Sequence, residues 1–160
     1  CSPNLVLYVY MFSINDLDKI NKELQPLKIL ADRELRSIYG LTGEVYTPHI
    51  DNHTEICLKK ARILINLKNN GIIPFTEVEI ISEQLMSLHQ KVKNHQVVEY
   101  NGHSYKCRYS PLKLSKTGKS VRKWAKYWLK LSVDGHTDDQ WESLVKEVWP
   151  EYFIIKNAAF

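Results

Sequence analysis

Residues 120–133, SVRKWAKYWLKLSV, alternate with a period of two, and this pattern constrains the fold more than any other in the chain. One set of positions is basic and aromatic: Arg122, Trp124, Lys126, Trp128 and Lys130. The other set is mostly apolar and includes Ala125, Tyr127, Leu129, Leu131 and Val133. Successive side chains of a β-strand point to opposite faces of its sheet. We therefore expect a strand whose apolar set packs on helices and whose basic and aromatic set faces outward.

The segments before this strand are expected to complete an antiparallel sheet. Residues 96–109 form two extended runs around an Asn-Gly dipeptide at 101–102, which tolerates the positive φ angles of a type I′ turn. Residues 110–120, SPLKLSKTGKS, are expected to form a long basic loop. In an in-register meander, Lys106 and Arg108 then lie beside the basic and aromatic positions of the third strand.

Helical patterns surround the predicted sheet. Thr76 and Glu79 have the spacing of a capping box, and apolar residues then repeat at helical spacing as far as Val92. The elements expected before this helix are a strand at 4–12, a helix from Ser13 interrupted by Pro26, a helix at 27–40, an extended segment at 43–51 and a helix at 52–71 capped by Asn52. After the sheet we expect a last helix opened by Thr137 and Gln140 and ended by Pro150, then a strand or docked tail at 151–160.

This order of elements predicts an α+β fold, in which several amphipathic helices pack on a three-stranded antiparallel meander with a long basic loop. A length of 160 residues predicts one domain over 1–160, with possible sub-parts at 1–53, 54–133 and 134–160.

The order of elements in 54–133, two helices and then a hairpin with a basic loop, resembles a winged helix. The resemblance implies DNA binding, with the second helix in the major groove and the hairpin on the backbone. Three acids on that helix, Glu77, Glu79 and Glu83, make the hairpin and its loop the better contact candidates.

Charge is distributed unevenly along the chain. Of 22 basic and 18 acidic residues, nine basic and one acidic fall between Glu99 and Lys130, so this segment carries +8 and the remainder −4. A one-sided positive field attracts polyanions, of which nucleic acid is the commonest.

The sequence therefore predicts a nucleic-acid-binding domain, for DNA or RNA, without catalysis or cofactor of its own and belonging to a larger assembly or longer chain. Phosphate contacts are expected from Lys106, Arg108, Arg122, Lys123, Lys126 and Lys130, stacking from Trp124 and Trp128, and mobile contacts from Lys113, Lys116 and Lys119. Two alternatives stay open for the same residues. They could form a solvated cation–π ladder, with a variant in which the tryptophans lie in the core and the apolar set lies under another element, or the tryptophans could anchor a protein–protein interface.

The segment HIDNH supports a different hypothesis. His49, Asp51 and His53 alternate, so an extended backbone would point all three the same way, as a divalent metal or general acid–base cluster requires. With the basic sheet, that cluster would indicate a metal-dependent nuclease. The competing interpretation is that Asp51 or Asn52 caps the following helix.

Other function classes lack their signatures. SKTGKS has lysine where a phosphate-binding loop needs its first glycine, and no CxxC pair is present for a cysteine-rich zinc site. No apolar run approaches the roughly 18 residues that span a bilayer, so no membrane partner is expected. Three widely spaced cysteines, an odd number, favour an intracellular setting.

Overall fold

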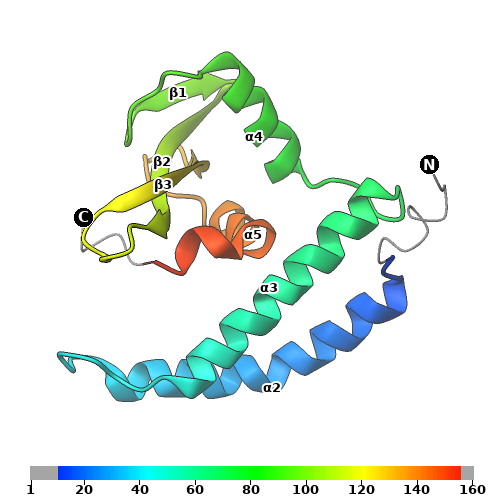
Figure 1. Ribbon diagram of the computed structural model, residues 1–160. Helices are drawn as coiled ribbons and strands as arrows, with labels where there is room; N and C mark the ends of the chain where they lie inside the picture. The colour runs from blue at the N-terminus through cyan, green and yellow to red at the C-terminus, as the bar shows by residue number, and fades with distance from the viewer. Residues whose placement is uncertain (1–10, 156–160) are drawn as a thin grey trace, which may run out of the picture. The chain divides into compact units, whose positions relative to one another are not determined.

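The computed structural model describes residues 11–155, and the chain divides into two compact units, residues 1–74 and 75–160. The first unit is a helical hairpin, and the second combines helices with a three-stranded sheet (Figure 1). The predicted α+β class is confirmed. The prediction of a single domain stays a prediction, and most of the strand expected at 4–12 lies outside the described residues.

In the first unit, α2 (Ile14–Ile38) is one continuous helix, which corrects the prediction of two helices separated by Pro26. Ser13 caps it, with Oγ accepting a hydrogen bond from the backbone N–H of Asp16 at 3.3 Å. A proline inside a helix costs about 3 kcal/mol because it removes a hydrogen bond and crowds the preceding turn. Apolar residues on both sides of Pro26, Leu24 and Leu27, pack into the same core cluster, and this packing offsets that cost.

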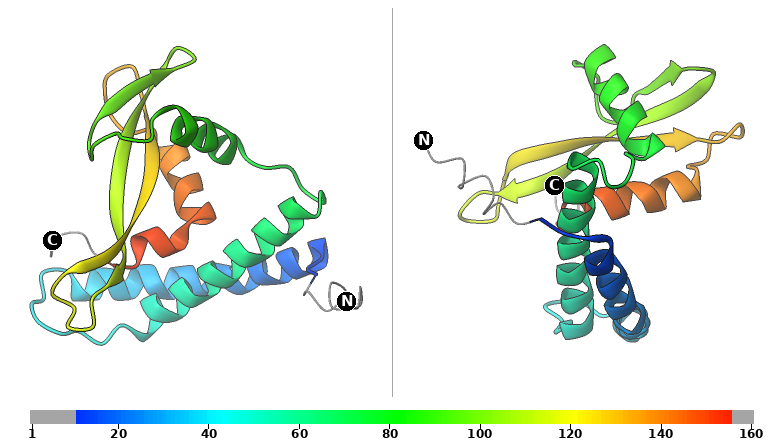
Figure 2. Two further views of the ribbon diagram at one scale, coloured as in Figure 1. Left: turned by 45° about the horizontal axis from the view of Figure 1, so that its top comes forward. Right: turned by 90° about the vertical axis from the view of Figure 1, so that its right-hand side faces the viewer.

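The second helix of this unit, α3 (Pro48–Asn69), lies antiparallel beside α2 (Figures 1 and 2). It begins before the predicted start at Asn52, so residues 48–51 are helical. Its first turn is capped from α2, because the Glu34 carboxylate accepts hydrogen bonds from the backbone N–H groups of His49 and Ile50 at 3.2 and 3.0 Å. Proline also suits the first helical position, where no N–H partner is needed.

The second unit is built on the antiparallel sheet β1-β2-β3. Its strands are β1 (Val97–Tyr100), β2 (His103–Leu114) and β3 (Val121–Leu131). Asn101 and Gly102 have φ angles of 49° and 78°, which confirms the predicted tight turn. The β2–β3 loop is shorter than expected because β2 continues to Leu114, and the Ser115 N–H closes it by donating to the Ser120 carbonyl at 2.9 Å.

Helical segments pack against both faces of this sheet. α4 (Glu77–Leu88) packs on the face that carries Tyr105 and Trp128, and Trp141 of α5 (Asp139–Val148) reaches the same face. On the other face, Tyr127 contacts Tyr152 and Phe153, which follow α5. The Thr76–Glu79 capping box is confirmed. Asp138, not Thr137, caps α5, because Thr137 forms a bridge with Leu131 at the end of β3. The short helix η1 (Pro150–Phe153) follows α5 in place of the predicted strand, and residues 156–160 lie outside the described part.

The core of the second unit centres on aromatic residues. Trp128 and Tyr105 are 0% and 1% exposed, and Trp141 reaches the same cluster from α5. The Trp141 ring lies 5.4 Å from that of Tyr105, and its Nε1–H donates to the Trp128 carbonyl at 2.9 Å. This bond fixes α5 against β3.

Replacing Trp141 with phenylalanine tests this link. W141F keeps a ring in the core but leaves the Trp128 carbonyl without its donor, so we expect the free energy of unfolding to fall by about 1–3 kcal/mol. Urea denaturation with an unchanged m-value measures the loss. W124F makes the same chemical change at a half-exposed residue and should cost less than about 0.5 kcal/mol. Equal losses in the two variants would contradict this role for Trp141.

Candidate nucleic-acid interface

The register of β2 and β3 divides the predicted binding residues between two faces. Directly opposed residues share a face of the sheet. On one face the pairs are Tyr105–Lys130, Cys107–Trp128, Tyr109–Lys126 and Pro111–Trp124. On the other they are Lys106–Leu129, Arg108–Tyr127 and Ser110–Ala125. The prediction that Lys106 and Arg108 lie beside the tryptophans is therefore wrong.

Trp128 does not face outward as predicted. It is fully buried, and its ring lies 6.1 Å from that of His89, which ends α4. An alternating pattern indicates that a strand has two different faces, but it does not show that either face is exposed to solvent. Here α4 covers the face that was expected to meet solvent, so Trp128 belongs to the core and cannot stack on a ligand.

Three of the predicted phosphate contacts take part in packing. The Lys126 ammonium donates to the His89 carbonyl at 2.6 Å and lies 5.5 Å from the Trp128 ring centroid. Lys130 lies 5.9 Å from the Trp141 ring centroid. Arg108 is half-buried, and its Nε has no hydrogen-bond partner among residues 11–155. For Lys126 and Lys130, the geometry matches the cation–π alternative, so these side chains stabilise the unit.

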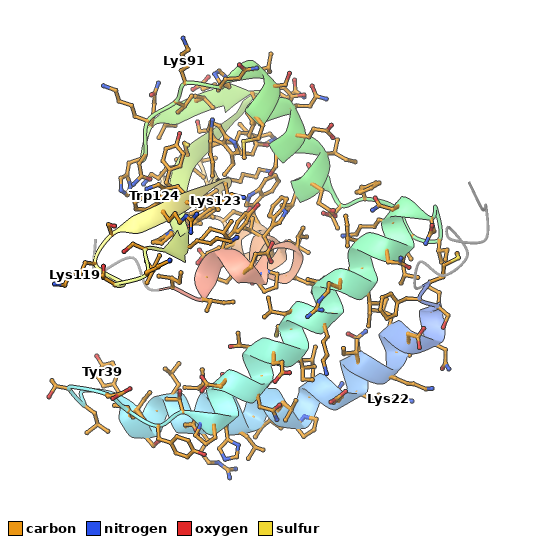
Figure 3. The ribbon with its side chains drawn as sticks, in the orientation of Figure 1. Lys22, Tyr39, Lys91, Lys119, Lys123 and Trp124 are labelled. Carbon is orange, nitrogen blue, oxygen red and sulfur yellow. The ribbon has the colours of Figure 1, made fainter. Side chains whose placement is uncertain are left out.

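The remaining predicted cations gather at the loop end of the hairpin, and we call them the basic hairpin tip. They are Lys113, Lys116, Lys119, Arg122 and Lys123, all exposed. Figure 3 shows Lys119 at the loop and Lys123 on β3. Within the described part of the chain, none of the five has an ion-pair partner, and no acidic residue occurs between Glu99 and Asp134.

The basic hairpin tip contains an unfavourable pairing. Lys113 lies directly opposite Lys123, and like charges facing each other across two strands are destabilising. The loop end also extends beyond α4 and α5, the helices of its own unit (Figure 2). These cations therefore make no contribution to packing that would explain their accumulation, and they are free to contact an anionic ligand.

Beside the tip, Trp124 is 46% exposed and lines a shallow pocket of about 300 Å³ with Asn94 and Tyr109. The Tyr109 hydroxyl donates to the Val92 carbonyl at 2.6 Å, and its backbone N–H donates to Asn94 Oδ1 at 3.1 Å. Sequence reasoning did not identify Asn94 or Tyr109. The observed register of β2 and β3 places Tyr109 on the Trp124 face, whereas the period of β2 alone leaves either set of its residues possible. No sequence signal indicates that Asn94, which precedes β1, returns to this point.

The groups behind the pocket are uncharged at neutral pH. Burial raises the pKa of the Tyr109 phenol above its ordinary value, and neighbouring Cys107 adds to the rise. Burial also raises the pKa of the Cys107 thiol, while the Lys126 charge opposes it. The site therefore combines a neutral aromatic pocket with adjacent fixed positive charge, an arrangement suited to a ligand with flat rings and anionic groups.

The predicted His49, Asp51 and His53 cluster does not assemble. These residues occupy the first turns of α3, where positions two apart point to different sides. Asp51 instead accepts a hydrogen bond from the Thr47 hydroxyl at 3.1 Å. No group of three potential metal ligands occurs among residues 11–155. Neither Asp51 nor Asn52 is the N-cap, because the helix begins at Pro48.

His53 has a separate electrostatic environment. Burial lowers its pKa below the ordinary value of 6.5, Asp32 opposes this and Lys28 adds to it. The Cys57 sulfur lies 3.7 Å from its Nε2. His53 is therefore mostly neutral at pH 7 and belongs to the α2–α3 packing.

A titration of the histidine ring signals by NMR checks this environment. We expect His53 to titrate below 6.5 and D32N to lower its pKa further, because Asp32 favours the protonated ring. D18N removes another acid of α2 and should leave the titration unchanged. A pKa above 6.5 in the unaltered protein would contradict the burial of this ring.

No protein-family model, curated protein or solved structure matches this chain. The winged-helix resemblance thus stays a prediction, and its elements are divided, since α3 belongs to the first unit and α4 and the hairpin to the second. None of the helices in residues 11–155 combines the length and apolar character needed to cross a membrane.

Acrylamide quenching of tryptophan emission tests the different exposure of Trp124 and Trp128. Because Trp128 and Trp141 are buried and Trp149 is partly covered, W124F should remove the largest share of quenchable emission. W128F is the matched control and should remove mainly shielded emission. The reverse result would mean that Trp128, and not Trp124, faces solvent.

Proposed function

We propose that this protein binds nucleic acid through the basic hairpin tip and has no catalytic step of its own. One observation carries the proposal: five exposed cations without ion-pair partners in residues 11–155 lie at one end of a hairpin. The rest of the chain is net acidic, so the attraction for a polyanion is confined to this region. Lysine and arginine bind phosphate groups by releasing condensed counterions.

The proposed interface is smaller than the sequence predicted. Lys106, Arg108, Lys126 and Lys130 contribute positive potential but are partly buried. At physiological salt a charge acts over about 8 Å, so these residues strengthen the field near β2 and β3 without direct contact. Direct phosphate contacts come from the tip, and Trp124 is the aromatic residue available beside it.

DNA and RNA both fit this chemistry, and the protein would act inside the cell, where these ligands occur. A small basic domain of this kind commonly serves within a larger assembly or a longer chain, and we extend the proposal to that role. Phosphate contacts need no cofactor.

A protein–protein interface anchored by Trp124 is the second candidate. A half-exposed tryptophan in an apolar pocket is typical of binding hot spots. The two candidates differ in salt dependence, because phosphate contacts weaken steeply as salt rises and an aromatic anchor does not. The metal-dependent nuclease has no supporting cluster within the described residues.

Fluorescence-anisotropy titrations across about 50–200 mM salt test the proposed function. Each phosphate contact contributes about 0.7 (single strand) or 0.9 (duplex) to the slope of log affinity against log salt. Removing two contacts with K116Q/K119Q should therefore reduce the slope by about 1.4–1.8 and weaken binding to all sequences similarly.

The matched control is K19Q/K22Q, which removes two exposed lysines from α2. It should leave both the slope and the affinity nearly unchanged. Absence of binding to any nucleic acid at the lowest salt would rule out the proposal. Equal effects of the two double variants would show that net charge, and not the tip, governs binding.

A further inference from the structure

We propose that the pocket beside Trp124 holds one unpaired nucleobase, so the protein prefers single-stranded nucleic acid to duplex. This inference rests on the proposed function and specifies its ligand. It depends on the position of the pocket next to the basic hairpin tip and on the hydrogen bonds that organise its wall.

The indole ring of Trp124 is partly open to solvent, although the residue lies within a β-strand of the packed sheet. It is opposite Pro111, which is fully buried, and the β2–β3 register shifts immediately beyond this pair. Such irregularities commonly lie next to binding sites because they re-aim side chains. The result is a half-exposed indole at the point where the packed sheet ends and the cationic hairpin end begins (Figure 3).

The pocket wall is already organised. The Tyr109 ring is held by its hydroxyl bond to Val92, and Asn94 Oδ1 is occupied by the Tyr109 N–H. The amide orientation of Asn94 is thereby set, which leaves its Nδ2 group as the donor at the pocket edge. An amide nitrogen is a donor only, so it would pair with an oxygen or nitrogen acceptor on a base edge.

The size and neighbours of the pocket indicate a base. Its volume of about 300 Å³ lies at the lower end of the roughly 300–1,000 Å³ of small-molecule pockets, which suits one planar ring system. Arg122 lies two positions before Trp124 on β3 and shares its face, so a phosphate flanking a stacked base would meet this cation, while Lys123 adds charge from the opposite face. A base within a duplex has both faces covered by its neighbours, so this contact requires an unpaired base.

The test compares labelled oligonucleotides of about 12 nucleotides, a length within single-strand site sizes. They are an oligothymidine, an oligouridine, an abasic strand with the same phosphates, and a duplex. Stacking of one base predicts that the oligothymidine binds about 5- to 150-fold more tightly than the abasic strand and quenches tryptophan emission. W124L should remove this advantage while leaving the affinity for the abasic strand and its salt slope unchanged.

Y39L is the matched control, because Tyr39 is a fully exposed aromatic residue in the first unit, and it should preserve the advantage. Retained binding of the abasic strand by W124L shows that this variant is folded. Tighter binding of the oligouridine assigns RNA as the ligand and tighter binding of the oligothymidine assigns DNA; either supports the inference when W124L abolishes the preference.

Two results would overturn the inference. Equal, salt-steep binding of the abasic strand and the oligothymidine would leave the proposed function in place but remove the base pocket. Tighter binding of the duplex would do the same. Absence of binding to all four ligands would instead eliminate the proposed function, and the inference with it.

Discussion

The register between β2 and β3 determines which side chains of the second unit are available to a ligand. With Trp128 opposite Cys107, the most aromatic part of β3 lies beneath α4, and Trp141 attaches α5 through its bond to the Trp128 carbonyl. On the other face, Tyr127 packs against Tyr152 and Phe153 of η1. The end of the hairpin beyond the Pro111–Trp124 pair continues past this packing, and it carries the exposed cations.

Lysine residues of the same hairpin therefore have two different roles, one in packing and one at the exposed hairpin end. Lys126 and Lys130 lie over tryptophan rings and add to stability, whereas Lys119 and Lys123 have no partner within the described residues. Placing like charges opposite each other at the hairpin end opposes folding and has no compensating acid nearby. A binding function for these cations supplies a physical reason for that placement.

The sequence predicted local structure well, but it did not predict which part of the sheet the helices would cover. The Asn-Gly turn at 101–102 and the Thr76 capping box depend on neighbouring residues, and both are present. Trp124 and Trp128 share one face of β3, and a period of two shows neither whether a helix covers that face nor where along the strand the cover ends, so the two residues were equivalent in the pattern and differ in the fold. The start of α3 depends on Glu34, and the pocket on Asn94; each contact joins residues at least 15 positions apart, beyond any local signal.

The most direct measurement is an amide chemical-shift titration of the isotopically labelled protein with a short single-stranded oligonucleotide. We expect the largest changes on residues 113–124 of the hairpin and on Asn94, with the Trp124 indole signal among them. Signals of α2 and α3 should stay nearly constant. Changes centred on those two helices, or no localised changes at all, would contradict the assignment of binding to the basic hairpin tip.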